Sequence, residues 1–267
     1  MGWRAKMDAG WLERFSGIDR LYGQGSIERL SGASVCVVGV GGVGSWVAEA
    51  LARSAVGHIR LIDADDVCIS NSNRQLPALA GNFGRSKVRL MAERLTAINP
   101  NARVDAIEQF LTPGNQAELI GEDVDVVIDA CDAFRVKVEL IAWCRRRKQR
   151  LIVVGSAGGR VDPTMVRLRD LSRTEHDAML ALIRKKLRSD FGFPRSANRY
   201  FSVPAVYSLE NVRYPQADGS VCGLRPKTDG GAGNLDCGRG LGAATHVTAT
   251  FGMAAVSRCL DLLLEKR

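Results

Sequence analysis

The stretch VCVVGVGGVGSWVAEALARSAVGHIRLIDADD, residues 35–66, decides the fold class. An apolar strand pattern runs into a glycine-rich turn, a helix pattern follows, and a second apolar strand pattern ends at Asp63. The turn contains Gly39, Gly41, Gly42 and Gly44. Glycines between a strand and a helix let the backbone approach a phosphate, and the start of the helix adds partial positive charge. An acid at the end of the next strand can bind a ribose hydroxyl, so the stretch predicts a nucleotide site that suits NAD as well as ATP.

Strand and helix patterns alternate along the chain beyond this stretch. Apolar runs without polar alternation, joined by helices, are typical of a parallel sheet that is covered on both faces. Right-handed crossovers between such strands give a doubly wound, Rossmann-like α/β fold with a mostly parallel sheet. The expected strands are 34–39, 58–63, 103–108, 124–130 and 150–155, and the expected helices between them are 44–55, 85–99 and 135–148.

The chain has 267 residues, of which 46% are hydrophobic, and we expect residues 1–267 to form a single domain. Its predicted parts are short N-terminal helices over 1–31, a nucleotide-binding core over 32–158 and an irregular, Gly-rich extension over 159–267 that we expect on the substrate and dimer side. In that extension we expect a strand or hairpin over 159–172, a basic helix over 176–191 and a mobile loop over 218–242.

The chain carries an excess of positive charge. Lys and Arg outnumber Asp and Glu by 37 to 29, which gives a net charge of +8 and a pI near 9.3. Two basic runs stand out, RRRKQR over 145–150 and RKKLR over 184–188. Such runs either form a solvated face or follow the phosphates of an RNA partner, and both interpretations stay open.

Cysteine usage and hydropathy predict a cytoplasmic protein. The seven cysteines are scattered without any CxxC pair, which argues against a disulfide scaffold and against a four-cysteine zinc site. The charged N-terminus does not resemble a signal peptide. The most apolar segment, 240–264, contains His246, Arg258 and Asp261 and suits a packed core helix better than a membrane span. No integral membrane segment is therefore expected, while peripheral association with a membrane stays open.

The residues after Asp63 favour ATP over NAD. The sequence DADDVCISNSNRQ, residues 63–75, stands where a dehydrogenase normally turns straight into its next helix. Arg74 and Lys87 can place two cations near the glycine turn, and Asp132 follows a predicted strand in the motif DACD. ATP brings about four negative charges and needs Mg²⁺ and basic groups beyond the helix start. Taken singly, the two cations could be solvated and Asp132 could cap a helix. Taken together, the three residues predict an ATP site in which Asp132 is the carboxylate beside the metal ion.

These motifs resemble those of the ubiquitin-activating-type adenylating enzymes, the ThiF/MoeB/HesA superfamily. The resemblance rests on GVGGVGS, DADDVCISNSNRQ, GRSK and DACD, and covers roughly residues 20–160. It implies catalytic roles for Arg74, Lys87 and Asp132, with Asp132 on magnesium. It also implies a nucleotide-binding set of Gly39, Gly41, Gly42, Gly44, Asp63, Asp65, Asn71, Arg74, Gln75 and Lys87, in which Asp63 holds the ribose and Asn71 reaches the triphosphate.

Over nearly its full length the chain is similar to one branch of this superfamily, the tRNA threonylcarbamoyladenosine dehydratases. The similarity is carried by AWCRRRK, SAGGRVDPT, YPQADGSVC and THVTATFGMAAVS, among other stretches. It implies ATP and Mg²⁺ as cofactors, a homodimer, and a tRNA with a modified anticodon loop as substrate, with no DNA partner. The implied reaction adenylates the threonyl carboxylate, closes a ring within the modified side chain, and releases AMP and pyrophosphate.

Two departures separate the chain from the related enzymes that adenylate sulfur-carrier proteins. It lacks their paired CxxC motifs, and its N-terminal stretch reads Arg14-Phe15-Ser16-Gly17-Ile18, without the arginine that reaches the partner subunit's ATP. Arg20 is the candidate replacement. Cys237, in the Gly-rich NLDCGRG, is either a reactive thiol linked to a cysteine desulfurase system or a spare loop cysteine.

Three alternative functions remain open from the sequence. The chain could adenylate the C-terminal glycine of a ubiquitin-like sulfur carrier, act as an NAD-dependent oxidoreductase, or sense a nucleotide as an RNA-binding module without turnover. ATP-dependent dehydration of the tRNA nucleotide explains more of the motifs than any of these, because it uses the two cations and Asp132 without a nucleophilic cysteine.

Overall fold

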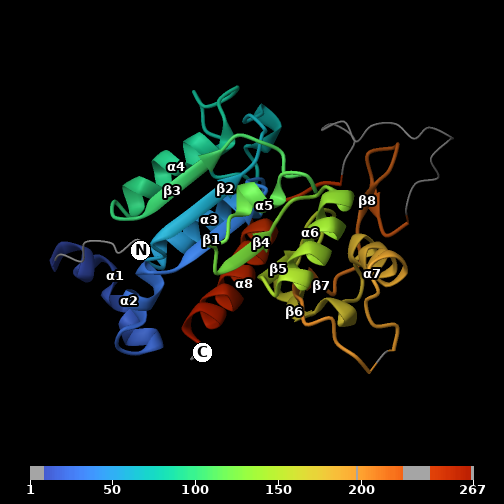
Figure 1. Cartoon of the computed structure of the whole chain (residues 1–267). Helices are drawn as coiled ribbons and strands as arrows, with labels where there is room; N and C mark the ends of the chain where they lie inside the picture. The colour runs from blue at the N-terminus through green and yellow to red at the C-terminus, as the bar shows by residue number, and fades with distance from the viewer. Residues whose placement is uncertain (1–8, 197, 225–240, 266–267) are drawn as a thin grey trace.

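A seven-stranded sheet organises the computed structural model, which describes residues 9–196, 198–224 and 241–265 (Figure 1). The strand order is β3-β2-β1-β4-β5-β7-β6. All neighbours pair in parallel except β6, which runs antiparallel to β7. The strands are β1 Ser34–Val38, β2 His58–Ile62, β3 Arg103–Ile107, β4 Val126–Asp129, β5 Arg150–Val154, β6 Val166–Asp170 and β7 Pro204–Ser208. The predicted doubly wound, mostly parallel fold is therefore confirmed.

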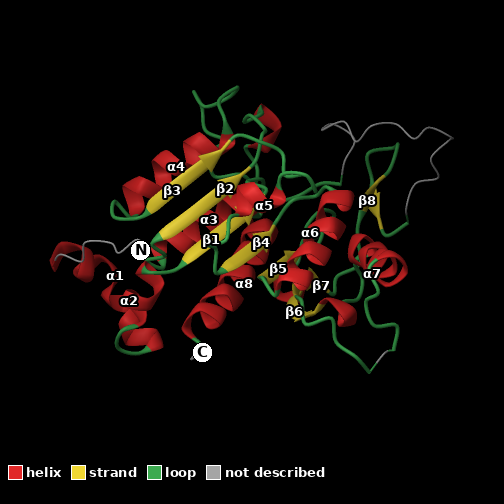
Figure 2. Cartoon of the chain, viewed as in Figure 1, coloured by secondary structure: helices red, strands yellow, loops and turns green. Residues whose placement is uncertain are grey.

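Helices cover both faces of this sheet, so its central strands β1 and β4 are buried at every position (Figure 2). Val35 and Val37 of β1 face a core shared with α3, α4 and α8, whereas Cys36 and Val38 face a second core shared with α5, α6 and α7. The helices are α3 Gly44–Arg53, α4 Lys87–Ile98, α5 Gln116–Ile120, α6 Phe134–Arg147, α7 Ala178–Asp190 and α8 Thr245–Leu264. The expected helices over 44–55, 85–99, 135–148 and 176–191 correspond to α3, α4, α6 and α7.

The remaining elements are short. Helices α1 Ala9–Tyr22 and α2 Ser26–Ser31 fill the predicted N-terminal helical region, separated by a turn that contains Gly23 and Gly25. Three 3-10 turns, η1 Ile69–Asn71, η2 Pro163–Met165 and η3 Leu171–Arg173, and a small hairpin, β8 Tyr214–Pro215 with β9 Val221–Cys222, complete the described chain. Most of the predicted mobile loop over 218–242 lies outside the described residues.

The edge of the sheet differs from the expectation. The strand or hairpin predicted over 159–172 is a single strand, β6, and its antiparallel partner β7 lies more than thirty residues further along the chain. β7 itself inserts between β5 and β6. Neither β7 nor α5 was predicted, because the pairing of β7 is non-local and both segments are only five residues long.

Helix α8 is a core helix, as its sequence predicted. Val247, Phe251 and Ala255 are fully buried in the core that α8 shares with α3 and the sheet. Among the described residues, α8 is long and apolar enough to span a membrane, but half of its most apolar window is buried in the fold. Buried core helices commonly combine this length and composition.

Glu49 links α3 to α4 through a nearly buried ion pair. Its Oε2 lies 2.6 Å from Nε of Arg94, and its Oε1 lies 2.8 Å from Nε of Arg53. Burial alone would raise the pKa of Glu49, but the hydrogen bonds from Arg94 and Arg53 outweigh that cost and hold the pKa below its ordinary value.

We expect Glu49→Gln to lower the free energy of unfolding at neutral pH by on the order of 1 kcal/mol, because the hydrogen bonds from Arg53 and Arg94 lose their charged acceptor. A carboxylate with a lowered folded pKa stabilises the fold above its unfolded pKa, and this contribution disappears as the pH falls through the folded pKa. Urea denaturation of both proteins from pH 7 to pH 3 should therefore show the difference shrinking with acidity. A difference that stays constant with pH would assign the effect to packing.

Candidate nucleotide-binding site

The glycine turn between β1 and α3 is folded so tightly that side chains are excluded. Gly39 has φ +86°, and a Cβ there would lie 2.8 Å from the backbone of Cys131. A Cβ on Gly44 would overlap the carbonyl oxygen of Gly39. The turn therefore needs glycine at both positions, and it brings the end of β1 against the loop that follows β4. At Gly44, the first residue of α3, no side chain stands between the helix backbone and a phosphate, as a phosphate-binding turn requires.

Asp63, at the end of β2, braces this turn. Its Oδ2 accepts a 2.6 Å hydrogen bond from the Val40 amide, and its Oδ1 accepts one of 2.9 Å from the Asp65 amide. A carboxylate retains further acceptor positions when each oxygen receives one bond. Asp63 can thus hold the backbone in shape and still accept a hydroxyl from a ribose.

Arg74 lies over the glycine turn. Carbons of its stem are 3.2 Å from the position of a Cβ on Gly42, and its guanidinium donates to Ser70 O at 2.9 Å and to Asn73 Oδ1 at 3.0 Å. The indole of Trp46 on α3 donates to the Arg74 carbonyl at 3.2 Å. The segment that carries Arg74 is therefore attached to the helix whose start forms the site.

Asn71 and Gln75 lie near Arg74 in the sequence, and their carboxamide groups differ in their hydrogen bonding. Asn71 is buried, and its Oδ1 accepts the Cys68 amide at 3.0 Å, so this oxygen shapes the 3-10 turn η1. Gln75 is also buried, its Nε2 lies 3.9 Å from the position of a Cβ on Gly41, and its Oε1 has no hydrogen-bond partner in the structure. A buried acceptor without a partner costs free energy, so Gln75 is suited to receive a donor from a ligand at the turn.

Lys87 is a buried lysine aimed at Asp65. Its Nζ lies 2.8 Å from Asp65 Oδ2, and only 7% of the Lys87 side chain is exposed, against 53% for Asp65. Its backbone amide also donates to the Asp65 carbonyl at 3.1 Å. The ammonium group of Lys87 is thus held beside the segment that follows Asp63. There a phosphate of a ligand can replace the carboxylate of Asp65 as its partner.

Asp132 is exposed in the loop between β4 and α6, one residue after the Cys131 backbone that touches Gly39. In the described part of the chain it makes no hydrogen bond or ion pair, and α6 begins after Ala133 without a side-chain cap. The alternative that Asp132 caps this helix is therefore not observed. Its carboxylate is free to meet a cation, although no group of three potential ligands is found among the described residues.

A buried ion pair fixes the loop that carries Asp132. Asp129 and Lys137 are both fully buried with 2.8 Å between Oδ1 and Nζ, and Asp129 Oδ1 also accepts the Cys131 amide at 3.3 Å. Burial, reinforced by the charge of Asp129, raises the pKa of the Cys131 thiol far above its ordinary value. Cys131 is therefore a poor nucleophile despite its place at the site.

The start of α8 joins the site, which the sequence did not indicate. Thr245 Oγ1 donates to the Asn73 carbonyl at 2.5 Å, and Asn73 Nδ2 donates to the Ala243 carbonyl at 2.7 Å. The Thr248 methyl lies 3.5 Å from the position of a Cβ on Gly42. The only available signal was the small and Thr-rich composition of THVTATFG, which predicts packing as readily as a site.

Two predicted residues are not brought into this site. Arg20 donates to Ser16 Oγ on its own helix α1, which is attached through Trp11 to Asn99, at the far end of α4. Cys237 lies outside the described residues. Within one chain, the structure therefore brings together Gly39, Gly41, Gly42, Gly44, Asp63, Asp65, Asn71, Arg74, Gln75, Lys87 and Asp132.

Comparison with known proteins identifies relatives along nearly the whole chain. The sequence profile of the ThiF family matches residues 16–266. The tRNA threonylcarbamoyladenosine dehydratase of Escherichia coli K12 is 47% identical over 96% of this chain and 95% of its own length. Crystal structures of E. coli tRNA N6-threonylcarbamoyladenosine dehydratase with ATP and with AMP are similar with TM-scores of 0.84 each, at 43% and 44% identity, and cover 96% of both chains.

The glycine turn gives a direct test of the site. We expect Gly44→Ala to abolish ATP binding measured by calorimetry, because its Cβ would overlap the Gly39 carbonyl and push the turn open. Gly81→Ala is the matched control, since a Cβ there meets nothing, although its positive φ of 88° adds strain. ATP affinity that survives in Gly44→Ala would show that the nucleotide does not depend on this turn.

Proposed function

The chain belongs to the ThiF family, and on this premise we propose that it uses ATP to dehydrate threonylcarbamoyladenosine in tRNA. The observation that carries the proposal is 47% identity to the E. coli dehydratase over nearly the whole of both chains. The site geometry supports it, because a phosphate-binding turn, a ribose-side acid and two cations stand at one edge of the sheet.

The proposed reaction begins at the threonyl carboxylate of the modified nucleotide. One carboxylate oxygen attacks the α-phosphorus of ATP, the bond from that phosphorus to the bridging oxygen of pyrophosphate breaks, and pyrophosphate leaves. A nucleophilic atom of the same modified side chain then attacks the activated carbonyl and loses its proton, and AMP departs with the carboxylate oxygen. The tRNA loses the elements of one water molecule, and the conversion of ATP to AMP and pyrophosphate supplies the driving force.

In this proposal the protein acts by positioning and electrostatics. Asp63 holds the ribose, the glycine turn holds the phosphates, and Arg74 and Lys87 neutralise charge on the pyrophosphate. Asp132 is the carboxylate that would hold Mg²⁺, and the ion would supply further neutralisation of the phosphate charge. Ring closure within one side chain needs no enzyme nucleophile, which agrees with the raised pKa of the Cys131 thiol.

We extend the proposal to a cytoplasmic homodimer. Arg20 lies away from the site of its own chain, so a contact with ATP would have to come from Arg20 of the partner subunit. In this proposal Cys237 is the residue through which a cysteine desulfurase system would act.

The carrier-protein alternative fits less well. The chain lacks the paired CxxC motifs expected for that branch, and the described residues hold no cluster of three metal ligands. The oxidoreductase alternative leaves the cations at Arg74 and Lys87 without a role. An RNA-binding module without turnover would retain the fold but not need an exposed, unbonded carboxylate at Asp132.

Nucleoside analysis tests the proposed function. Mass spectrometry of tRNA from a strain that lacks this gene should show loss of cyclic threonylcarbamoyladenosine and accumulation of the open form. Purified protein with ATP and magnesium should restore the cyclic form and release one AMP for each ring. Stimulation of pyrophosphate release by a sulfur-carrier protein instead of tRNA would favour the carrier-protein alternative.

Replacement of the proposed catalytic residues tests the site. We expect Lys87→Met and Asp132→Asn each to reduce pyrophosphate release at least a hundredfold, because charge that stabilises the departing pyrophosphate is lost. Circular dichroism should show an intact fold, since Asp132 is exposed and methionine matches the buried stem of Lys87. Exposed Arg89→Gln on α4 is the control and should retain activity. Near-normal turnover of either variant would remove that residue from the reaction.

A further inference from the structure

Cations without carboxylate partners are frequent between residues 140 and 200. Between residues 50 and 110, Arg74 is the single Lys or Arg without an ion pair. Between residues 140 and 200, by contrast, only Arg169 and Lys186 have one in the described structure. Within the described residues, the fold therefore pairs most cations of α3, β2, α4 and β3 with carboxylates, whereas most of those on α6, α7 and the loops beside them have none; Arg14, Arg20 and Arg29 of α1 and α2 are also without an ion pair.

The two basic runs of the sequence meet at the ends of α6 and α7, which lie side by side (Figure 1). The Arg146 guanidinium, at the end of α6, lies 5.9 Å from the ring centre of Phe191, which follows α7. Runs that are more than thirty residues apart in the sequence therefore form one surface.

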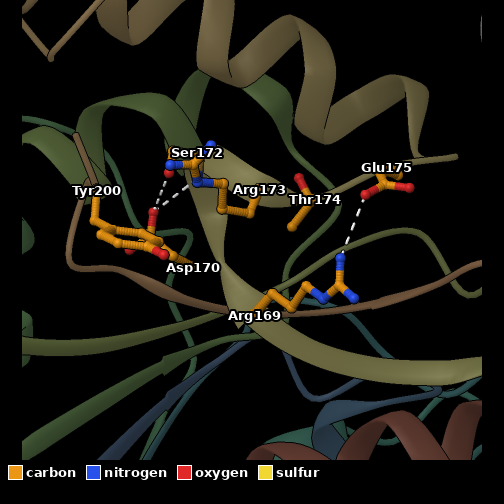
Figure 3. Close-up of a pocket in the computed structure, with 7 residues that line it drawn as sticks. All are labelled: Arg169, Asp170, Ser172, Arg173, Thr174, Glu175 and Tyr200. Carbon is orange, nitrogen blue, oxygen red and sulfur yellow. Dashed lines mark hydrogen bonds and ion pairs between the residues drawn. The ribbon is translucent and has the colours of Figure 1, made fainter. Parts of the chain in front are cut away.

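Three adjoining hollows shape this surface. One, of about 440 Å³, is lined by Arg184, Lys185, Arg188, Arg195, Ala181 and Ser189, without a carboxylate. The second, of about 670 Å³, includes Arg169, Arg173 and Tyr200 (Figure 3), and the third, of about 620 Å³, includes Arg145, Lys148 and Arg150. Arg184 donates to Thr174 Oγ1 between the first two hollows, and Arg169 and Asp170 line both the second and the third. We call these cations the basic band: Arg145, Lys148, Arg150, Arg173, Arg184, Lys185, Arg188 and Arg195.

The carboxylates beside the band are already occupied. Asp170 accepts the backbone amides of Ser172, Phe201 and Val203. Glu175 pairs with Arg169, as Figure 3 shows, and Asp261 lies 3.9 Å from Arg258. These acids do not neutralise the band, so its charge is available to an anionic partner.

Aromatic rings accompany the arginines. All four cation–π contacts in the described structure involve this region, including Arg173 at 4.8 Å from the ring centre of Tyr200 and Arg188 at 5.3 Å from that of Phe201. Tyr200 is 62% exposed and stands at the rim of the second hollow (Figure 3). Oriented guanidinium groups with an exposed ring suit nucleic acid, because the cations bind phosphates and the ring stacks on a base.

The band lies at a distance that suits a large substrate. Helix α6 begins two residues after Asp132 and has 14 residues, so its basic end lies about 20 Å from the nucleotide site at 1.5 Å per residue. Resting on the proposed function, we propose that the basic band binds the phosphate backbone of the tRNA away from the modified nucleotide, with Tyr200 as a stacking platform. The band thus supplies affinity for RNA that the adenylation site does not.

The test uses exposed cations that make no side-chain bond. In the full-length protein, the combined variant Arg145→Gln, Lys148→Gln, Lys185→Gln and Arg195→Gln should weaken tRNA binding at least tenfold at 0.15 M salt. The slope of log affinity against log salt should fall by about 3, since up to four phosphate contacts are lost. ATP affinity and melting temperature should stay unchanged. Tyr200→Leu should weaken binding several-fold without changing the slope.

A matched control variant distinguishes the effect of losing the basic band from the effect of lowering the net charge of the protein. The combined variant Arg29→Gln, Arg53→Gln, Arg89→Gln and Arg103→Gln loses the same charge from exposed positions on α2, α3, α4 and β3, outside the basic band, and should bind tRNA like the wild type. An unchanged affinity and slope in the band variant, or an equal loss in the control, would overturn the proposal. Equally effective competition by poly-aspartate, or by vesicles of phosphatidylglycerol, would assign the surface to an acidic protein or a membrane instead and also overturn it.

The outcome for the band is distinguishable from the outcome for the proposed function. If the wild type binds tRNA but forms no cyclic nucleotide, the proposed function fails, while a loss of binding in the band variant still supports the surface. If the wild type forms the cyclic nucleotide and the band variant binds tRNA normally, only the surface is wrong.

Discussion

The nucleotide edge of this molecule depends on the contact between Gly39 and Gly44. No Cβ fits at Gly44 beside the Gly39 carbonyl, and none fits at Gly39 beside the Cys131 backbone. The contact joins the end of β1, the start of α3 and the loop after β4, and the hydrogen bond from the Val40 amide to Asp63 adds the end of β2. Each residue that can meet a phosphate is carried on a segment attached to this unit, so the turn sets their spacing.

The buried lysines Lys137 and Lys87 differ in whether their carboxylate partner can be replaced by an anion. Lys137 is fully buried against Asp129 and contributes no net charge to the surface, so its effect is to hold the loop that presents Asp132. Lys87 is almost as buried, but its partner Asp65 is half exposed and can be hydrated when an anion replaces it. Breaking the first pair would leave a charge in the core, whereas exchanging the second leaves both groups satisfied.

The sequence predicted the parallel half of the fold, and it named most of the residues that the structure brings together around the glycine turn, because both depend on local patterns. Apolar runs and glycine spacing located β1, α3 and β2 to within one or two residues. The pairing of β6 with β7 and the arrival of the α8 start beside Asn73 could not be predicted, since both join segments far apart in the chain. The bonding of Asn71 within its own turn was also missed: its carboxamide shapes the loop, a use that motif matching does not reveal.

Adenylation by itself cannot explain selection of an RNA substrate. A phosphate-binding turn and two cations recognise ATP, and a carboxylate presented to them is a group that many metabolites carry. Discrimination must then come from contacts outside the reacting atoms, and these contacts must lie where a long polyanion can reach them while its modified nucleotide occupies the site. The described structure places unpaired arginines about one helix length away and pairs the cations of α4 and β3 with carboxylates. Such an asymmetric charge distribution orients a polyanion before chemistry begins, which a uniformly basic surface of the same net charge could not do.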